Sequence, residues 1–339
     1  MGDVFDLLAQ NTELLALAAV LFGLLIGSFL NVVILRLPQM MQAEWQRDCA
    51  ELLEEISPAP CTSEEIPPAP PFSKGGEEQS LPLKKEDQES PSLEKDSKSP
   101  PLKKGGWGDS SISLSSPPST CPHCGHRIRA YENIPIISYL LLRGRCSSCH
   151  THISLRYPLV EALTALLTLA VALHFGMTWQ LPAALVLTWA LIALALIDYD
   201  TQLLPDNIVL PLLWLGLLLN AFGMFTDSQT AIIGAVAGYL SLWTVFQLFR
   251  LATGKEGMGY GDFKLLALFG AWFGWQLLPQ IVLLSALTGA VLGVLLIVTG
   301  QQRREQPLPF GPFLAVAGWI SLLWGDAINT AYFHLSGLN

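Results

Sequence analysis

The chain has 339 residues, of which 51% are hydrophobic and only 14% are charged, and its formal net charge is −9. Soluble domains carry roughly 25% charged residues, so the composition excludes an ordinary soluble fold, as well as collagen, a coiled coil, a secreted disulfide scaffold and a wholly disordered chain. It predicts an all-α polytopic membrane protein. Because the net charge is not basic, no nucleic acid is expected as a partner.

Eight apolar segments, each of roughly 20 residues, are candidate transmembrane helices. The first is preceded by acidic residues and by no Lys or Arg, the wrong charge for a signal peptide, so we expect it to be a retained helix. The sixth runs almost directly into the seventh at Trp275–Pro279, which predicts a tight helical hairpin there. The eight segments cover residues 14–36, 157–175, 181–199, 208–225, 230–251, 262–277, 278–299 and 310–332.

The distribution of Lys and Arg predicts the orientation of these helices. Fourteen of the 19 basic residues lie between Arg36 and Arg156, in the long connection after the first helix. With eight helices and both termini outside, all 19 fall on the cytoplasmic side, as the positive-inside rule requires. The five basic residues beyond the long connection are Arg250, Lys255, Lys264, Arg303 and Arg304.

The long cytoplasmic connection divides into two parts of different composition. Residues 39–118 are rich in Pro, Ser, Glu and Lys and poor in aromatic residues, which favours disorder; a linker insertion is expected there rather than a partner-binding segment. Residues 119–156 contain cysteine pairs and aromatic residues and are expected to be ordered. The predicted organisation is therefore a first helix (1–38), a disordered insertion (39–118), a four-cysteine module (119–156) and a seven-helix membrane domain (157–339).

Two cysteine pairs define the small module. Cys121-Pro-His-Cys124 and Cys146-Ser-Ser-Cys149 can supply four thiolates to one tetrahedral ion, so the spacing predicts a structural zinc site. About 30 ordered residues can hardly fold alone, and a bound metal supplies the missing stabilisation. Redox-active CxxC pairs are the alternative, although a reducing cytoplasm disfavours disulfides. The adjacent His123 and His150 are interpreted as neighbours of the ligands, because four sulfur atoms already fill the coordination shell.

Two aspartates stand at the ends of apolar segments on different helices. Asp198 ends the third segment and Asp262 opens the sixth, and the expected topology places both at the cytoplasmic border. Ionisable residues at membrane depth are costly and are therefore functional candidates. Two carboxylates that share a water molecule are the catalytic arrangement of an aspartic protease. Asp200 and Asp206 lie further out and are interpreted as helix-end residues, Asp206 as a helix cap.

The complete set of motifs resembles one family, the bacterial prepilin peptidases, which are the type 4 leader peptidases of pilus and type II secretion systems. The resemblance covers nearly all of the chain except residues 39–118. The matching segments are Gly27–Pro38, Cys121–Cys124, Glu132–Pro135, Leu142–Cys146, Arg156–Glu161, Asp198 with Leu204–Asp206, Gly259–Leu265 and Pro309–Pro312.

The resemblance implies a role for each motif residue. Asp198 and Asp262 correspond to the two catalytic aspartates of a GxGD-type intramembrane peptidase. The glycines before Asp262 let the backbone turn tightly and let a substrate strand approach without obstruction by a Cβ atom. The supporting motif residues are Gly259, Gly261, Lys264 and Pro205, and the metal ligands are Cys121, Cys124, Cys146 and Cys149.

The resemblance also implies the substrates. The family cleaves the short basic leader of type IV prepilins and pseudopilins after a glycine, on the cytoplasmic side of the bacterial inner membrane. Members with the cysteine-bearing loop usually methylate the new N-terminal amine with S-adenosylmethionine, so methylation is expected here. Spacing alone assigns no methyl-donor site. Glu132, Glu161 and Asn31 are polar candidates, for each of which a local structural role is the preferred interpretation.

Other functions remain open at this level. The chain can be a peptidase without methylation, an ion-coupled transporter in which Asp198 and Asp262 relay protons, or a zinc-bearing scaffold of a secretion machine. A transporter predicts carboxylates near the bilayer midplane and inverted repeats, and the sequence has neither. A scaffold predicts that both aspartates are replaceable.

Overall fold

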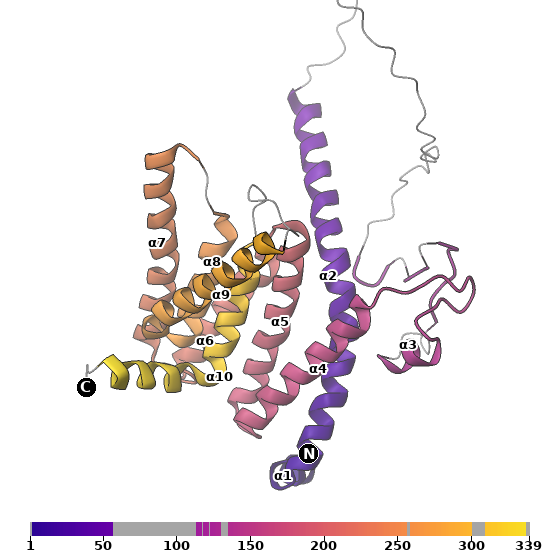
Figure 1. Cartoon of the computed structure of the whole chain (residues 1–339), viewed down its shortest axis with the longest axis horizontal. Helices are drawn as coiled ribbons and strands as arrows, with labels where there is room; N and C mark the ends of the chain where they lie inside the picture. The colour runs from indigo at the N-terminus through magenta and orange to yellow at the C-terminus, as the bar shows by residue number, and fades with distance from the viewer. Residues whose placement is uncertain are drawn as a thin grey trace, which may run out of the picture. The chain divides into compact units, whose positions relative to one another are not determined.

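The computed structural model of the protein describes residues 2–56, 113–116, 118–121, 123–129, 135–255, 258–299 and 309–336. These residues are helical apart from turns and two isolated β-bridges, Thr120 with Arg127 and Arg145 with His152, in agreement with the all-α prediction. The chain divides into one unit of residues 1–43 and 112–339 and a second of residues 44–111. The helices are α1 (Gly2–Gln10), α2 (Thr12–Ile56), α3 (Ile137–Leu141), α4 (Arg156–Phe175), α5 (Gln180–Thr201), α6 (Asp206–Ala221), α7 (Ser228–Thr253), α8 (Tyr260–Phe273), the 3-10 turn η2 (Trp275–Leu277), α9 (Leu278–Val298) and α10 (Gly311–Ser336) (Figure 1).

Six helices of the described residues are long and apolar enough to cross a membrane: α2, α4, α5, α7, η2 with α9, and α10. Each of the eight expected segments does contain a helix. However, α6 has 16 residues and α8 has 14, fewer than the roughly 20 that span a bilayer as a straight helix. Six of the eight expected spans are therefore long and apolar enough by themselves, and α6 and α8 are shorter helices.

Helix α2 is longer than expected. The sequence predicts a first helix that ends near residue 36 and a disordered insertion from residue 39, but α2 continues to Ile56. Residues 39–56 contain neither Gly nor Pro and are rich in Gln, Glu, Leu and Ala, which favour helix. The average composition of residues 39–118 favours disorder and does not reveal the helix-favouring stretch at residues 39–56. Residues 57–112 of the insertion lie outside the described part of the chain.

Helix α8 lies in the unit of residues 1–43 and 112–339, where it packs against α6, α7 and α10 (Figure 1). Every residue from Leu265 to Trp272 is buried, as expected for a helix that is apolar on all sides. The amide of the buried Asn220 donates to the carbonyl oxygens of Ala271 and Trp272, at 2.8 and 2.9 Å, and so satisfies the end of α8. The length of α8 therefore fits its protein surroundings rather than a lipid layer.

Glycines bring α7 and α8 into backbone contact. Gly234 of α7 and Gly270 of α8 face each other so closely that a Cβ atom on either would overlap the backbone carbonyl of the other. Gly238 meets Leu266 of α8 in the same way. This packing fixes the position of α8 relative to α7.

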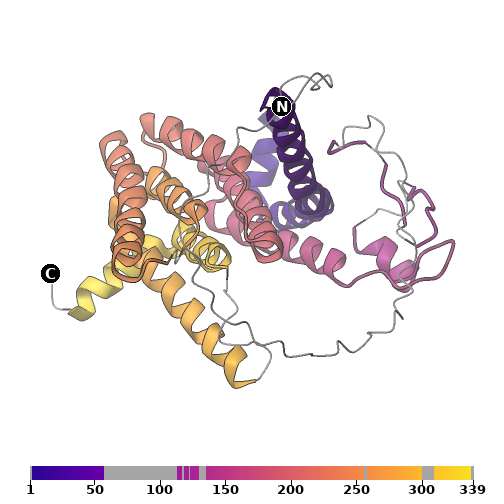
Figure 2. The ribbon, with the colours of Figure 1, turned by 90° about the horizontal axis from the view of Figure 1, so that it is seen from above.

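A second group of helices consists of α2, α4 and α5. Gly23 and Gly27 of α2 lie against the backbone of α4, and Figure 2 shows the indigo α2 beside the magenta α4. Apolar side chains from all three helices form one buried cluster, made of Leu30, Ile34, Val160, Ile192, Ala193 and Ile197.

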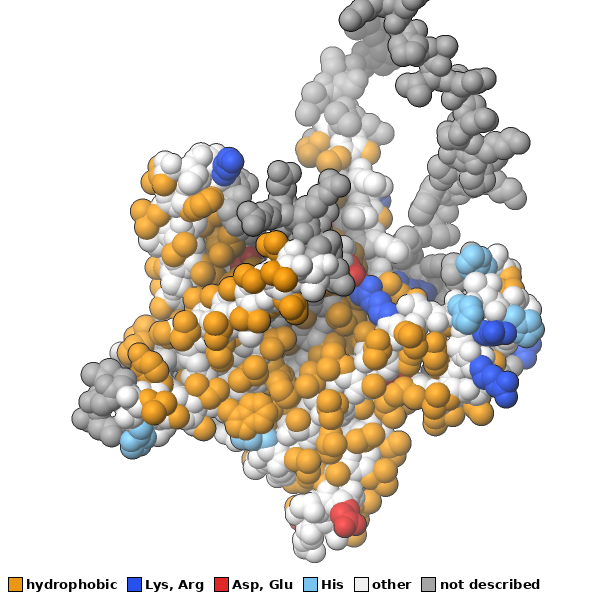
Figure 3. All heavy atoms as spheres, in the orientation of Figure 1, with side chains coloured by type: hydrophobic (Ala, Val, Ile, Leu, Met, Phe, Trp, Pro, Cys, Tyr) orange, Lys and Arg blue, Asp and Glu red, His pale blue; other side chains and the backbone are white. Residues whose placement is uncertain are grey.

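The surface of the helices is strongly apolar. In Figure 3, hydrophobic side chains cover the visible face of the helices, whereas Lys, Arg and His side chains gather on the cysteine module. Helix α9, for example, exposes Leu283, Leu287, Val291 and Val294. Exposed apolar surface of this extent is unfavourable in water and typical of contact with an apolar phase.

Candidate active site

Asp198 lies in the last turn of α5 and is only 5% exposed. Helix α5 ends because Gln202 adopts a left-handed conformation, with φ 56°, and its N–H donates to the carbonyl of Asp198. The Asp198 carboxylate accepts a hydrogen bond from the backbone of Gly311, at the start of α10. A Cβ atom on Gly311 would lie 2.5 Å from Asp198 Oδ2, so this approach requires glycine. The motif Pro309–Pro312 was part of the family resemblance in the sequence, but it did not predict this contact with Asp198.

Asp262 lies in the first turn of α8 and is 6% exposed. Its carboxylate hydrogen-bonds to the backbone at Gly259, the residue that precedes the helix. A Cβ atom on Gly261 would lie 2.7 Å from Cβ of Leu204, so this glycine allows α8 to pack against the connection between α5 and α6. Gly259 and Gly261 therefore shape the first turn that presents Asp262.

The two carboxylates come from helices far apart in sequence, and both are buried at one place. The charge of Asp198 acts electrostatically on Asp262, so the side chains lie within interaction range. Helices α5 and α8 both pack against α10, whose first residue contacts Asp198. The structure thus brings together the two aspartates that the sequence singled out.

Two ion pairs flank the aspartates. Lys264 Nζ lies 2.7 and 2.8 Å from the two carboxylate oxygens of Asp206, and Arg156 donates two hydrogen bonds to Asp200. Both acidic residues lie at helix ends, as expected, but the capping role expected for Asp206 is wrong. Pro205 occupies the cap position of α6, and Asp206 is bound to Lys264 instead.

The connection between α5 and α6, residues 202–205, and Asp206, the first residue of α6, touch the first turns of α8 at two points. Leu204 packs on Gly261, and Asp206 pairs with Lys264. The buried Pro205 between them has a fixed φ and accepts the first backbone hydrogen bonds of α6. A short, constrained segment therefore follows the end of α5, which carries Asp198, and packs against the start of α8, which carries Asp262.

The four expected metal ligands form one cluster. The sulfur atoms of Cys121, Cys124, Cys146 and Cys149 all lie within 4.8 Å of one another, and all four thiols are free. Cys121 Sγ and Cys149 Sγ are 3.7 Å apart, which fits the edge of about 3.8 Å that 2.3 Å zinc–sulfur bonds give a tetrahedron. Hydrogen bonds from Thr151 lower the pKa of the Cys149 thiol to about 6, whereas desolvation and the neighbouring thiols raise the pKa of the Cys124 thiol to about 11. The cluster can bind a metal ion.

His150 has a backbone role in this module. Its φ is 57°, and its N–H donates to the carbonyl of Cys146, as Gly125, with φ 70°, does to Cys121 in the first cysteine pair. Only the cysteines belong to the candidate ligand group among the described residues.

The polar candidates for methyl transfer lie between α2, α4 and the module. Glu161 is 7% exposed and accepts a hydrogen bond from Ile136 N at 2.8 Å and another from the Ser28 hydroxyl. The side-chain amide of Asn31 donates to the carbonyl of Tyr157 at 3.1 Å. Glu132 lies outside the described residues.

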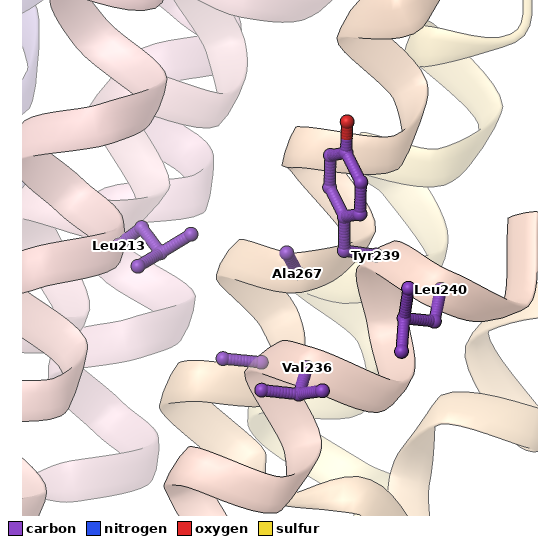
Figure 4. A pocket seen from close by; sticks show the side chains of 6 residues that line it. Leu213, Val236, Tyr239, Leu240 and Ala267 are labelled. Atoms are coloured by element: carbon purple, nitrogen blue, oxygen red, sulfur yellow. The ribbon is translucent and has the colours of Figure 1, made fainter. Parts of the chain in front are cut away.

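An apolar hollow lies elsewhere, among α6, α7 and α8 (Figure 4). No charged side chain lines it, and neither aspartate belongs to it, so it is not the place where hydrolysis is expected. Its lining consists of Leu213, Ala235, Val236, Tyr239, Leu240 and Ala267.

Comparison with known proteins identifies the family. Residues 21–175 match the bacterial peptidase A24 N-terminal domain, and residues 185–294 match the type IV leader peptidase family. The chain therefore belongs to the type IV leader peptidase family, and the resemblance seen in the motifs is confirmed. Asp198 and Asp262 fall in the second matched region, and the four cysteines and Glu161 fall in the first.

Several relatives align over almost their whole length. The chain is 48% identical to the prepilin leader peptidase/N-methyltransferase of Stutzerimonas stutzeri, over 98% of this chain and 99% of the relative. It is 49% identical to the protein of that name from Pseudomonas aeruginosa, with the same coverage, and 49% identical to that of Aeromonas hydrophila, over 92% and 91%. No solved structure matches the chain.

Proposed function

We propose that the protein removes the basic leader of type IV prepilins and pseudopilins at the cytoplasmic face of the bacterial inner membrane, and then methylates the new N-terminal amine. The observation that carries the proposal is the burial of Asp198 and Asp262 within interaction range of each other, in a chain of the type IV leader peptidase family. A peptidase without methylation is the coarser alternative.

Hydrolysis follows from the chemistry of two neighbouring carboxyl groups. One carboxylate takes a proton from a water molecule, which attacks the scissile carbonyl, while the other, protonated, donates a hydrogen bond to the carbonyl oxygen. The backbone of Gly311 holds the Asp198 carboxylate, and the backbone at Gly259 holds that of Asp262. Burial keeps other water molecules away and strengthens these interactions.

A multi-pass orientation with both termini outside agrees with this chemistry. It leaves all 19 basic residues on the cytoplasmic side, the side on which a prepilin leader remains. In this arrangement α6 and α8 also traverse the protein. Their shortness is compatible with that path because α8 is enclosed by other helices and need not match the lipid thickness.

We further propose that the cysteine cluster holds a structural Zn²⁺, since four thiolates at this spacing are a closed tetrahedral donor set. S-adenosylmethionine supplies the methyl group in the second reaction.

The proposal is tested with a prepilin in membranes, with and without S-adenosylmethionine. Gel mobility reports leader removal, and the mass of the mature pilin reports methylation. The wild-type chain is expected to do both, and Asp198→Asn is expected to abolish cleavage. Asp200→Asn is the matched control, because Asp200 lies on the same helix, is partly exposed and pairs with Arg156. Cleavage by Asp198→Asn at the wild-type rate would contradict the proposal.

A further inference from the structure

The cysteine module has a basic surface that neither proposed reaction uses. Residues 119–156 contain five arginines against one acidic residue, Glu132, in a chain whose net charge is −9. Arg127, Arg143 and Arg145 are exposed, and none of the three forms an ion pair with another described residue. Figure 3 shows basic and hydrophobic side chains together on this part of the surface. The positive charge of these arginines is therefore available to a partner outside the described chain.

Exposed apolar side chains lie directly beside two of these arginines. Helix α3 exposes Ile137, Leu140 and Leu141, and the two leucines are 67% and 77% exposed. Arg143 and Arg145 follow Leu141 within four residues. Exposed leucines are unfavourable in water, whereas arginine side chains are costly in hydrocarbon. A surface that combines both fits the boundary between lipid headgroups and acyl chains.

The backbone holds this surface at the start of a membrane-spanning helix. The N–H of Ile153 donates to the carbonyl of Gly144 at 2.8 Å, so the segment that contains α3 and the two arginines is fixed beside Ile153. Three residues further, at Arg156, begins α4, one of the six helices long and apolar enough to cross a membrane. Leu155 and Leu159, on either side of this start, are each 64% exposed. The surface of α3 therefore adjoins the apolar surface with which α4 enters the lipid.

We infer that the surface made of Ile137, Leu140, Leu141, Arg143 and Arg145 docks on anionic phospholipid headgroups at the face of the membrane where α4 begins. The inference goes beyond the proposed function and requires only that α4 crosses the membrane. The leucines enter the interface, and the guanidinium groups bind phosphate oxygens. A membrane is favoured over an acidic protein as the partner, because the chain itself already holds this surface within a few residues of the bilayer.

The test compares the full-length protein in nanodiscs of phosphatidylcholine alone and of phosphatidylcholine mixed with anionic phosphatidylglycerol. Hydrogen exchange of the backbone amides of residues 137–145 is measured in both. Docking shields these amides, so phosphatidylglycerol is expected to slow their exchange in the wild-type protein, by about fivefold for each of the two arginines. High salt is expected to reverse most of this effect, because it screens the charges.

A variant with Arg143→Gln and Arg145→Gln is expected to exchange equally fast in both lipid mixtures. Arg250→Gln is the matched control, because Arg250 is an exposed arginine in the last turn of α7, outside the module. This control is expected to keep the full effect of phosphatidylglycerol. The amides of Cys146 and Ile153, which form hydrogen bonds within the module, report whether the module stays folded in each variant.

Two outcomes would overturn the inference. The first is equal exchange of residues 137–145 in the two lipid mixtures in the wild-type protein, a comparison that depends on no variant. The second is a slowing by phosphatidylglycerol that the double arginine variant retains, because the surface would then dock without its charges. Neither result concerns leader cleavage or methylation, so the inference and the proposed function fail separately.

Discussion

At the scale of single residues, a glycine at the start of α10 determines how closely the chain can approach Asp198. Gly311 contributes its backbone to the carboxylate, and only hydrogen occupies the position where a Cβ atom would lie 2.5 Å from Oδ2. An alanine there must push the carboxylate or the helix aside. Displacement by a fraction of an ångström is enough to disturb a reaction that depends on alignment.

Gly311→Ala is therefore expected to lower kcat for leader cleavage by about a hundredfold with little change in KM. The measurement is steady-state cleavage of a prepilin in detergent. Gly289→Ala in α9 is the control, because its Cβ atom would meet Phe313 at an ordinary 3.4 Å. Equal activity of the two variants would show that Gly311 does not position Asp198.

Residue identity and spacing were sufficient to predict that Asp198 and Asp262 come close to each other and that the four cysteines cluster, because each of these residues lies in a compact motif. The contacts of Gly311, Ser28 and Ile136 were not predictable in this way. They arise where segments far apart in sequence meet, and nothing in the local pattern of any one segment specifies its partner.

At the scale of elements, the contacts of Leu204 and Asp206 with α8 hold the first turns of the helix that carries Asp262. The ion pair of Lys264 with Asp206 is partly exposed, with 30% and 49% of the side chains accessible, and such pairs contribute only about 0–1 kcal/mol to stability. The ion pair is expected to position the first turns of α8, because Lys264 lies two residues after Asp262.

Lys264→Met is expected to slow leader cleavage about tenfold through misplacement of α8, with a change in unfolding free energy below about 1 kcal/mol. Cleavage rate and thermal unfolding are measured on the same preparation. The exchanged pair, Lys264→Asp with Asp206→Lys, should recover part of the rate. A rate in the exchanged pair no better than in the single variant would argue against an ion-pair role.

The packing of α7 on α8 yields a stability prediction. Gly270→Ala forces a methyl group into the backbone of Gly234 and is expected to destabilise the protein by about 1–3 kcal/mol or more. The midpoint of thermal unfolding in detergent measures this effect, again with Gly289→Ala as the control. An unchanged midpoint would mean that the two helices are not in contact at these glycines.

Element boundaries were harder to predict than element types. The apolar runs predicted where helices occur, but α6 and α8 are shorter than their runs, because hydropathy does not distinguish lipid contact from burial against other helices. Helix α2 extends to Ile56 because helix propensity acts locally, within a segment whose overall composition favours disorder.

At the scale of the whole molecule, the two matched regions, residues 21–175 and 185–294, carry separate groups of polar residues. The cysteine cluster belongs to the first domain and the aspartates to the second. Small metal-binding modules with few ordered residues often fold only with their metal, so metal loss is expected to be visible in the first domain alone.

Cys146→Ser is expected to reduce bound zinc from one ion per chain to well below one, measured by elemental analysis, and to make the module susceptible to limited proteolysis. Cys49→Ser is the matched control, because Cys49 is exposed on α2 and lies outside the cluster. Full zinc occupancy in Cys146→Ser would exclude the four-thiolate site.

The central claim is that Asp198 and Asp262 act together on one water molecule. Its most direct test is the single-turnover rate of leader cleavage in Asp198→Asn, in Asp262→Asn and in the double variant. Each single change is expected to lower the rate by at least about a hundredfold, and the double variant to be no slower than the slower single one, because the two groups act as a unit. Losses that multiply in the double variant, or either single variant cleaving at the wild-type rate, would contradict the account.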